Sequence, residues 1–121
     1  MKKALILLVA LAGLALAHHG QAAYDMTTKV TVQGTITEFH FTNPHCVLEM
    51  DVKDDKGQVQ TWQGELTSAS RLGRSGWTPA SLKAGDEVTV TGYRARSGAF
   101  SLWITKVVGS NGQELKIEAG N

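Results

Sequence analysis

The side chains that bind metals most readily are concentrated near the start of the chain. Two of the four histidines, His40 and His45, lie close to the single cysteine, Cys46, and the other two are adjacent, at His18 and His19. Imidazole nitrogens suit copper and zinc, and a thiol is a soft metal ligand. The sequence therefore points to metal binding, provided that the two groups of histidines meet in the folded chain.

The first 17 residues have the features of a secretory signal peptide. Two lysines follow the initial methionine, residues 4–16 are apolar, and Ala15 and Ala17 place small residues at the −3 and −1 positions of a cleavage site. The apolar run is short for a membrane span, and no cluster of charges follows it. We therefore expect cleavage after Ala17 and export, with His18 as the mature N-terminus and no membrane contact thereafter.

An N-terminal histidine offers a specific chelate for copper. The α-amine and ring Nδ1 of His18 can bind one ion, and a second imidazole from His45 or His40 completes the three-nitrogen set called a histidine brace. Copper is favoured because Cu²⁺ heads the affinity order of the divalent metals, and an α-amine of pKa about 7.7–8.0 is easily deprotonated. His19 is a further candidate ligand, through its ring and the terminal amine.

The distance between the two groups of histidines permits this site without requiring it. A strand expected over residues 30–41 spans roughly 40 Å at about 3.3 Å per residue, and the segment 18–29 can reach back over a similar distance. We expect this N-terminal arm to run beside the strand and to place His18 near His45. The alternative is that each histidine is solvated separately and that Asn43-Pro44-His45 is only a turn.

The net charge argues against a nucleic-acid partner. Loss of two lysines with the signal peptide lowers the 12 basic residues to 10, against 11 acidic ones. Proteins that bind nucleic acids normally carry a basic excess, which this chain lacks. The expected partner is a metal ion, and the sequence identifies no protein partner.

Alternation of apolar and polar residues predicts a mainly β protein. It is clearest over residues 46–53, where Cys46 begins the apolar face and is therefore expected to be buried. The apolar phase changes within the strand 30–41, which also contains Gly34, so we expect a bend or bulge there. Further strands are expected at residues 58–66, 86–93 and 99–108, with a short last one at 114–117.

Turn and cap signals divide these strands. Residues 54–57 form a hairpin turn, and Asn111-Gly112 is a type I′ signal. A short helix is expected to begin at Thr67 or Ser68, and Thr78-Pro79 suggests a second one. Three strands, a helical connection and two or three more strands favour an all-β fold, a five-stranded OB-like barrel over residues 30–117. A β-sandwich is the alternative.

The chain also resembles a family of small bacterial periplasmic proteins known only as a domain of unknown function. The resemblance covers nearly all of the chain after residue 17, and the two histidines at the signal junction and the later Asn-Pro-His are its most specific parts. It implies periplasmic localisation and an OB-like barrel, and it brings no established activity. Cys46 stands where an ordinary strand residue such as valine is expected. The segments that carry the resemblance are Ala17–Gly20, Tyr24-Asp25, Gly34–Glu38, Asn43–His45, Trp62, Ser70–Leu72 and Gly85–Tyr93.

The sequence favours a binding protein over an enzyme. A histidine brace can support oxygenase chemistry, but the chain shows no clear substrate platform, and its serines lack the G-x-S-x-G elbow of hydrolases. The main alternative to a copper protein is a metal-independent OB module that binds a ligand or a protein. That surface is expected to comprise Phe39, Phe41, Val47, Trp62 and residues 42–45. Arg71, Arg74, Arg94 and Arg96 are either an anion-binding patch or ordinary surface.

Overall fold

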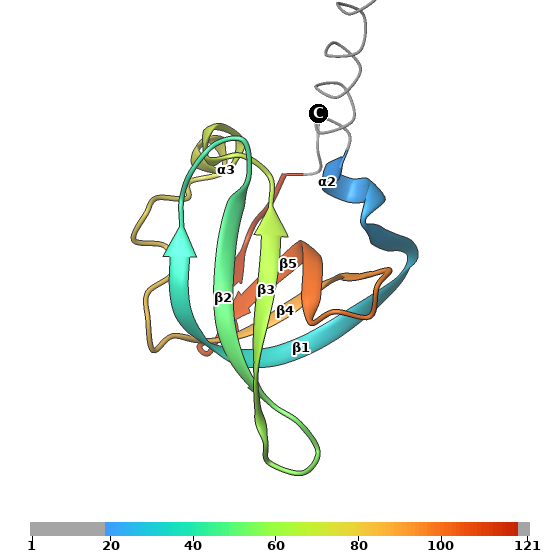
Figure 1. Ribbon diagram of the computed structural model, residues 1–121. Helices are drawn as coiled ribbons and strands as arrows, with labels where there is room; N and C mark the ends of the chain where they lie inside the picture. The colour runs from blue at the N-terminus through green and yellow to red at the C-terminus, as the bar shows by residue number, and fades with distance from the viewer. Residues whose placement is uncertain (1–18, 119–121) are drawn as a thin grey trace, which may run out of the picture.

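The computed structural model describes residues 19–118, and of His19 only the backbone (Figure 1). No helix within this range is long and apolar enough to cross a membrane. The predicted signal peptide, residues 1–17, lies outside the described residues. The elements follow in the order α2 (His19–Ala22), β1 (Tyr24–His40), β2 (Cys46–Lys53), β3 (Val59–Leu66), α3 (Ala69–Arg74), β4 (Glu87–Ala95), β5 (Ser101–Gly109) and β6 (Glu114–Leu115).

The six strands form one sheet that closes into a barrel. Their order is β3-β2-β1-β4-β5-β6, and all of these neighbours are antiparallel. Closure comes from a parallel pairing of β3 with β5, in which Gly64 lies opposite Leu102 and Glu65 opposite Trp103. The helix α3 connects β3 to β4. This arrangement confirms the predicted OB-like barrel with five principal strands and a helical connection after the third.

The long strand β1 curves beneath the barrel from α2 to the loop that precedes β2 (Figure 1). Its pairing with β2 shifts register between Ile36 and Glu38, which identifies a bulge. Ile36 is buried before this bulge, whereas Phe39 packs against the core after it. The bulge therefore explains the change of apolar phase in the sequence, although it lies beyond Gly34, the position that suggested it.

The barrel interior is apolar. The buried side chains of the described residues are all hydrophobic. Cys46 is one of them and has no exposed surface, so its predicted burial is confirmed. Trp77 closes one end of the core and donates its indole N–H to the carbonyl of Lys116, at 2.9 Å. The other core residues are Ile36, Leu48, Met50, Val52, Trp62, Leu66, Leu72, Leu82, Val88, Val90, Leu102, Ile104 and Val107.

Three expected local structures differ in the fold. β1 begins at Tyr24, not Val30: Tyr24 pairs with Ala95 of β4 and Lys29 with Tyr93, and the register shifts between these two pairs. Residues 78–85 form turns instead of a second helix, and the hydroxyl of Thr78 caps the amide of Ala80. The turn at Asn111-Gly112 is not type I′, since that type requires a positive φ at both residues and only Gly112 has one.

Candidate functional site

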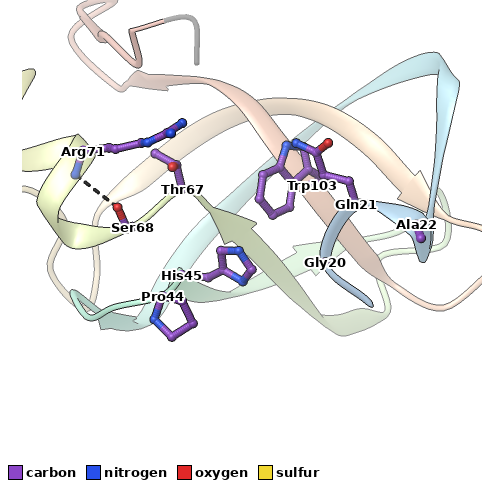
Figure 2. Close-up of a pocket in the computed structure, with 9 residues that line it drawn as sticks. All are labelled: Gly20, Gln21, Ala22, Pro44, His45, Thr67, Ser68, Arg71 and Trp103. Atoms are coloured by element: carbon purple, nitrogen blue, oxygen red, sulfur yellow. Dashed lines mark hydrogen bonds between the residues drawn. The ribbon is translucent and has the colours of Figure 1, made fainter. Parts of the chain in front are cut away.

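An open pocket of about 450 Å³ lies at one end of the barrel. The helix α2 forms one wall, and the opposite wall comes from α3 and the segment that joins it to β3 (Figure 2). The loop before β2 and one residue of β5 complete it. The lining residues are Gly20, Gln21, Ala22, Pro44, His45, Thr67, Ser68, Arg71 and Trp103.

The loop that carries His45 is fastened to α3. Asn43 Oδ1 accepts hydrogen bonds from the backbone N–H and the hydroxyl of Ser70, at 3.1 and 3.3 Å. The carbonyl of Thr42 accepts from the amide of Ala69, at 3.1 Å. These bonds, together with the restricted backbone of Pro44, fix the direction in which the chain enters β2. His45 is therefore presented to the pocket from a constrained loop.

The His45 imidazole lies close to both the indole of Trp103 and Gly20 of α2, the element that we call the N-terminal wall. It meets Trp103 edge to face, with ring centroids 5.4 Å apart and planes at 87°. A Cβ placed on Gly20 would lie 3.3 Å from its Cε1 atom and 3.8 Å from Nε2. No described group from Gly20 to Glu118 forms a hydrogen bond with the ring. Its nitrogens therefore remain available to a ligand as far as the described part of the chain is concerned.

The N-terminal wall is held against the barrel at several points. The backbone N–H of Arg96 donates to the carbonyl of Ala23 at 2.9 Å, and its Nε donates to the carbonyl of Ala22 at 3.2 Å. Next along the chain, the phenol of Tyr24 donates to Glu65 at 3.0 Å and lies 3.3 Å from the Ser101 hydroxyl. Burial raises the pKa of this phenol, and the nearby Glu65 carboxylate adds to the effect. The chain thus reaches the pocket in a defined position.

Of the two predicted metal ligands whose side chains the structure describes, His40 and His45, only His45 lines the pocket. His40 is exposed at the end of β1, where its Nε2 lies 3.0 Å from a carboxylate oxygen of Glu38. His18 lies outside the described residues, as does the side chain of His19. Between Gly20 and Glu118, no three histidine, cysteine, aspartate or glutamate side chains come close enough to hold a metal. A brace would therefore need the groups of His18.

Cys46 does not line the pocket. Its side chain points into the core, where burial raises the pKa of the thiol, and its Sγ lies 3.5 Å from the carbonyl of Thr42. His45, the last loop residue before β2, lines the pocket, whereas Cys46, the first residue of β2, packs in the core.

Of the surface expected for a metal-independent OB module, only Trp62 is buried, whereas residues 42–44 are exposed and Phe39, Phe41, His45 and Val47 are half-buried. Trp62 is buried beneath Phe100, with ring centroids 5.1 Å apart, and the Arg94 guanidinium lies over both rings. Phe39 packs against Trp77. Trp62 therefore contributes to the fold, whereas Phe39 packs against the core and keeps part of its surface exposed.

The four arginines considered as an anion patch have separate roles. Arg94 covers aromatic rings, and Arg96 holds the N-terminal wall. Arg71 lines the pocket, whereas Arg74 does not. Beside Arg71 lie Thr67 and Ser68, which the sequence marked only as possible helix caps. Ser68 is the cap: its Oγ accepts from the amide of Arg71 at 3.2 Å. No sequence signal indicated that these residues, or Trp103, face His45.

These features define a small OB-like barrel protein with a pocket between its N-terminal helix and the helix that follows β3. The chain belongs to the family of unknown function DUF6152, whose family model matches residues 6–102. No curated protein matches the sequence.

Two solved structures are similar in part. One is a ZRD-deleted mutant of TiaS in complex with agmatine, which is 17% identical over 66% of this chain with a TM-score of 0.49. This chain spans only 20% of that protein's length. The other is a mitochondrial single-stranded DNA binding protein from S. cerevisiae, 16% identical, with 69% of this chain and 93% of that chain covered and a TM-score of 0.47.

Proposed function

We propose that this protein is an exported, periplasmic copper-binding protein that holds Cu²⁺ through an N-terminal His18 and through His45. The observation that supports it best is the proximity of Gly20 to the ring of His45: a Cβ built on Gly20 would lie 3.3 Å from Cε1. Gly20 follows His18 by two residues. The chain therefore approaches the His45 imidazole within two residues of the predicted mature N-terminus.

The route of this approach differs from the one expected from the sequence. The arm does not run back beside the strand, because residues 24–29 belong to β1, which curves beneath the barrel (Figure 1). Instead, α2 lines the same pocket as His45. A ligand carried on a constrained loop loses little freedom on binding, which favours His45 as the distant imidazole. The amine and ring of His18 supply the other nitrogens, and copper fits a set made only of nitrogen donors.

His40 is the less suitable second imidazole. It is exposed, bonded to Glu38 and absent from the pocket lining, whereas His45 lies in the pocket beside the N-terminal wall. We therefore assign His45 to the site and use His40 as the matched control.

The mature N-terminus is tested first, by intact-mass measurement of the secreted protein. A mass that corresponds to residues 18–121 is expected. Any other start removes the amine from the chelate and contradicts the proposed brace.

Copper titration then tests the ligands. Addition of three residues before His18 keeps every side chain, moves the amine and leaves no histidine second or third from the new terminus, where it would form a copper chelate of its own. His45→Ala removes the distant imidazole. Each change is expected to weaken Cu²⁺ binding at least about tenfold, or about 1.4 kcal/mol, and the two together should be less than additive because they act on one ion. His40→Ala should bind as the unchanged protein does.

The electron paramagnetic resonance spectrum of the bound Cu²⁺ supplies a second readout, since each change removes a nitrogen ligand. Copper affinity that neither change reduces would refute the brace. The metal-independent OB binding module would then be the remaining interpretation.

A further inference from the structure

The side of the pocket opposite α2 carries hydrogen-bond donors and no carboxylate. The side chain of Arg71 extends toward the pocket from α3, with Thr67 and Ser68 beside it (Figure 2). Among the side chains described from Gly20 to Glu118, the Arg71 guanidinium has no ion-pair partner, and it forms no hydrogen bond with this part of the chain. No acidic residue lines the pocket. This half of the pocket is therefore suited to a negatively charged group.

The hydroxyl groups of Thr67 and Ser68 also favour a negatively charged ligand on this side of the pocket. Ser68 Oγ already accepts a hydrogen bond from the amide of Arg71, so its own O–H is the group left to donate. The hydroxyl of Thr67 has no partner among the side chains and backbone of the described range. An oxyanion at this point could accept from the guanidinium and from both hydroxyls, and bonds of this charge-assisted kind are the stronger ones.

The other half of the pocket is less polar. The indole of Trp103 and the ring of Pro44 supply its apolar surface, and the His45 imidazole lies between them (Figure 2). A volume of about 450 Å³ lies within the range of about 300–1,000 Å³ that is usual for sites of small organic molecules. A single inorganic ion would leave most of it filled with water.

We propose that this pocket binds a small organic carboxylate. The carboxylate pairs with the Arg71 guanidinium, which presents its donors in a planar fork that matches two oxygens. Thr67 and Ser68 donate further hydrogen bonds, and the apolar body of the ligand lies against Trp103 and Pro44. This inference goes beyond copper binding and requires no metal, because its anion-binding groups are distinct from His18 and His45.

Amide NMR of the secreted protein, stripped of metal with a chelator, tests this proposal with benzoate as the probe. We expect saturable shifts at Thr67, Ser68 and Arg71 and at the indole N–H of Trp103. Benzamide has nearly the same shape without the charge and should bind at least about tenfold more weakly. Inorganic phosphate should also bind more weakly than benzoate, since it lacks the apolar body.

Arg71→Gln is expected to weaken benzoate binding at least about tenfold, whereas Arg74→Gln, on the same helix but outside the pocket, should change it less than about twofold. Equal affinity for benzoate and benzamide, an unaffected Arg71→Gln variant, or no saturable shift in the pocket would each overturn the proposal. If phosphate bound as tightly as benzoate, the proposal that the ligand is an organic molecule would be wrong. Arg71→Gln should keep its copper affinity, so failure here and failure of the copper site are separate results.

Discussion

Asn43 is joined to Ser70 by two hydrogen bonds that cross 27 residues of sequence, from the Ser70 amide and hydroxyl to Asn43 Oδ1. The pair connects the loop before β2 to the first turn of α3. Both elements line the pocket, one through His45 and the other through Arg71. The Asn-Pro-His segment is therefore more than a turn, because its first residue fixes the loop whose third residue faces the pocket.

Replacement of Asn43 by alanine should loosen this loop without unfolding the barrel. Both bonds are exposed to solvent, so we expect a loss of stability of about 1 kcal/mol or less and faster hydrogen exchange of the Ser70 amide. Copper affinity should fall a few-fold through the greater freedom of His45. Asn43→Asp keeps the acceptor oxygen and should restore the slow exchange. Unchanged exchange at Ser70 in the alanine variant would show that the bonds do not fix the loop.

The thiol of Cys46 should react slowly in the folded protein. It has no exposed surface, and burial raises its pKa, so the reactive thiolate is both scarce and covered. We expect a bulky maleimide to label it only as urea unfolds the chain, with a labelling rate that follows the unfolding transition. Rapid labelling of the metal-free protein in buffer would contradict this orientation of Cys46.

Tyr24 should make the protein sensitive to alkali. Because burial raises its pKa above 10.0, the folded state holds the phenol proton more tightly than the unfolded state does. Stability is therefore expected to be constant in this respect below pH 10 and to fall as the pH rises through the pKa of the folded state. Tyr24→Phe removes this titration, so the loss above pH 10 should be smaller in the variant. Urea unfolding at several alkaline pH values measures the difference.

Two glycines should respond in opposite ways to alanine. A Cβ on Gly92 would press on the carbonyl oxygen of Trp103 and lie 2.9 Å from its carbonyl carbon, and this backbone belongs to β5. We expect Gly92→Ala to lower the free energy of unfolding by about 1–3 kcal/mol. Gly73, in α3, has open space around it, so Gly73→Ala should leave stability unchanged or raise it by up to about 1 kcal/mol.

Urea unfolding followed by tryptophan fluorescence compares these two variants directly. Equal stabilities would contradict the close approach of β4 to β5 at Gly92. A native fluorescence change in Gly92→Ala alone is also expected, because the added methyl group displaces the backbone that carries the Trp103 indole.

The parts of the fold that depend on local pattern could be predicted from the sequence. Alternation placed Cys46 on the buried face of β2, the change of apolar phase in β1 marked its bulge, and Ser68 begins a short helix as its side chain allows. Residues 24–29 show no such pattern, and in the fold this segment is joined to β4 through its two ends, Tyr24 and Lys29. Their strand conformation is a property of the assembled sheet.

The site could be predicted only in part, for a related reason. The sequence drew attention to His45, and the structure places it in a pocket, but its neighbours come from three distant segments. Trp103 meets His45 because β3 and β5 pair at Glu65, and Gly20 meets it because β1 curves. Neither relationship leaves a periodic signal. The ligand role of His18 remains a prediction.

The hydrogen bond between the side chains of Tyr24 and Ser101 has a consequence for when the pocket can form during synthesis. These residues are 77 positions apart, and the N-terminal segment is synthesised long before the strand that holds it. A chain emerging from the ribosome would present His45 and Arg71 before Trp103 exists. The pocket can therefore form only when β5 arrives, in the same event that closes the barrel. A chain that ended before β5 would lack both the β3–β5 pairing that closes the barrel and the complete pocket.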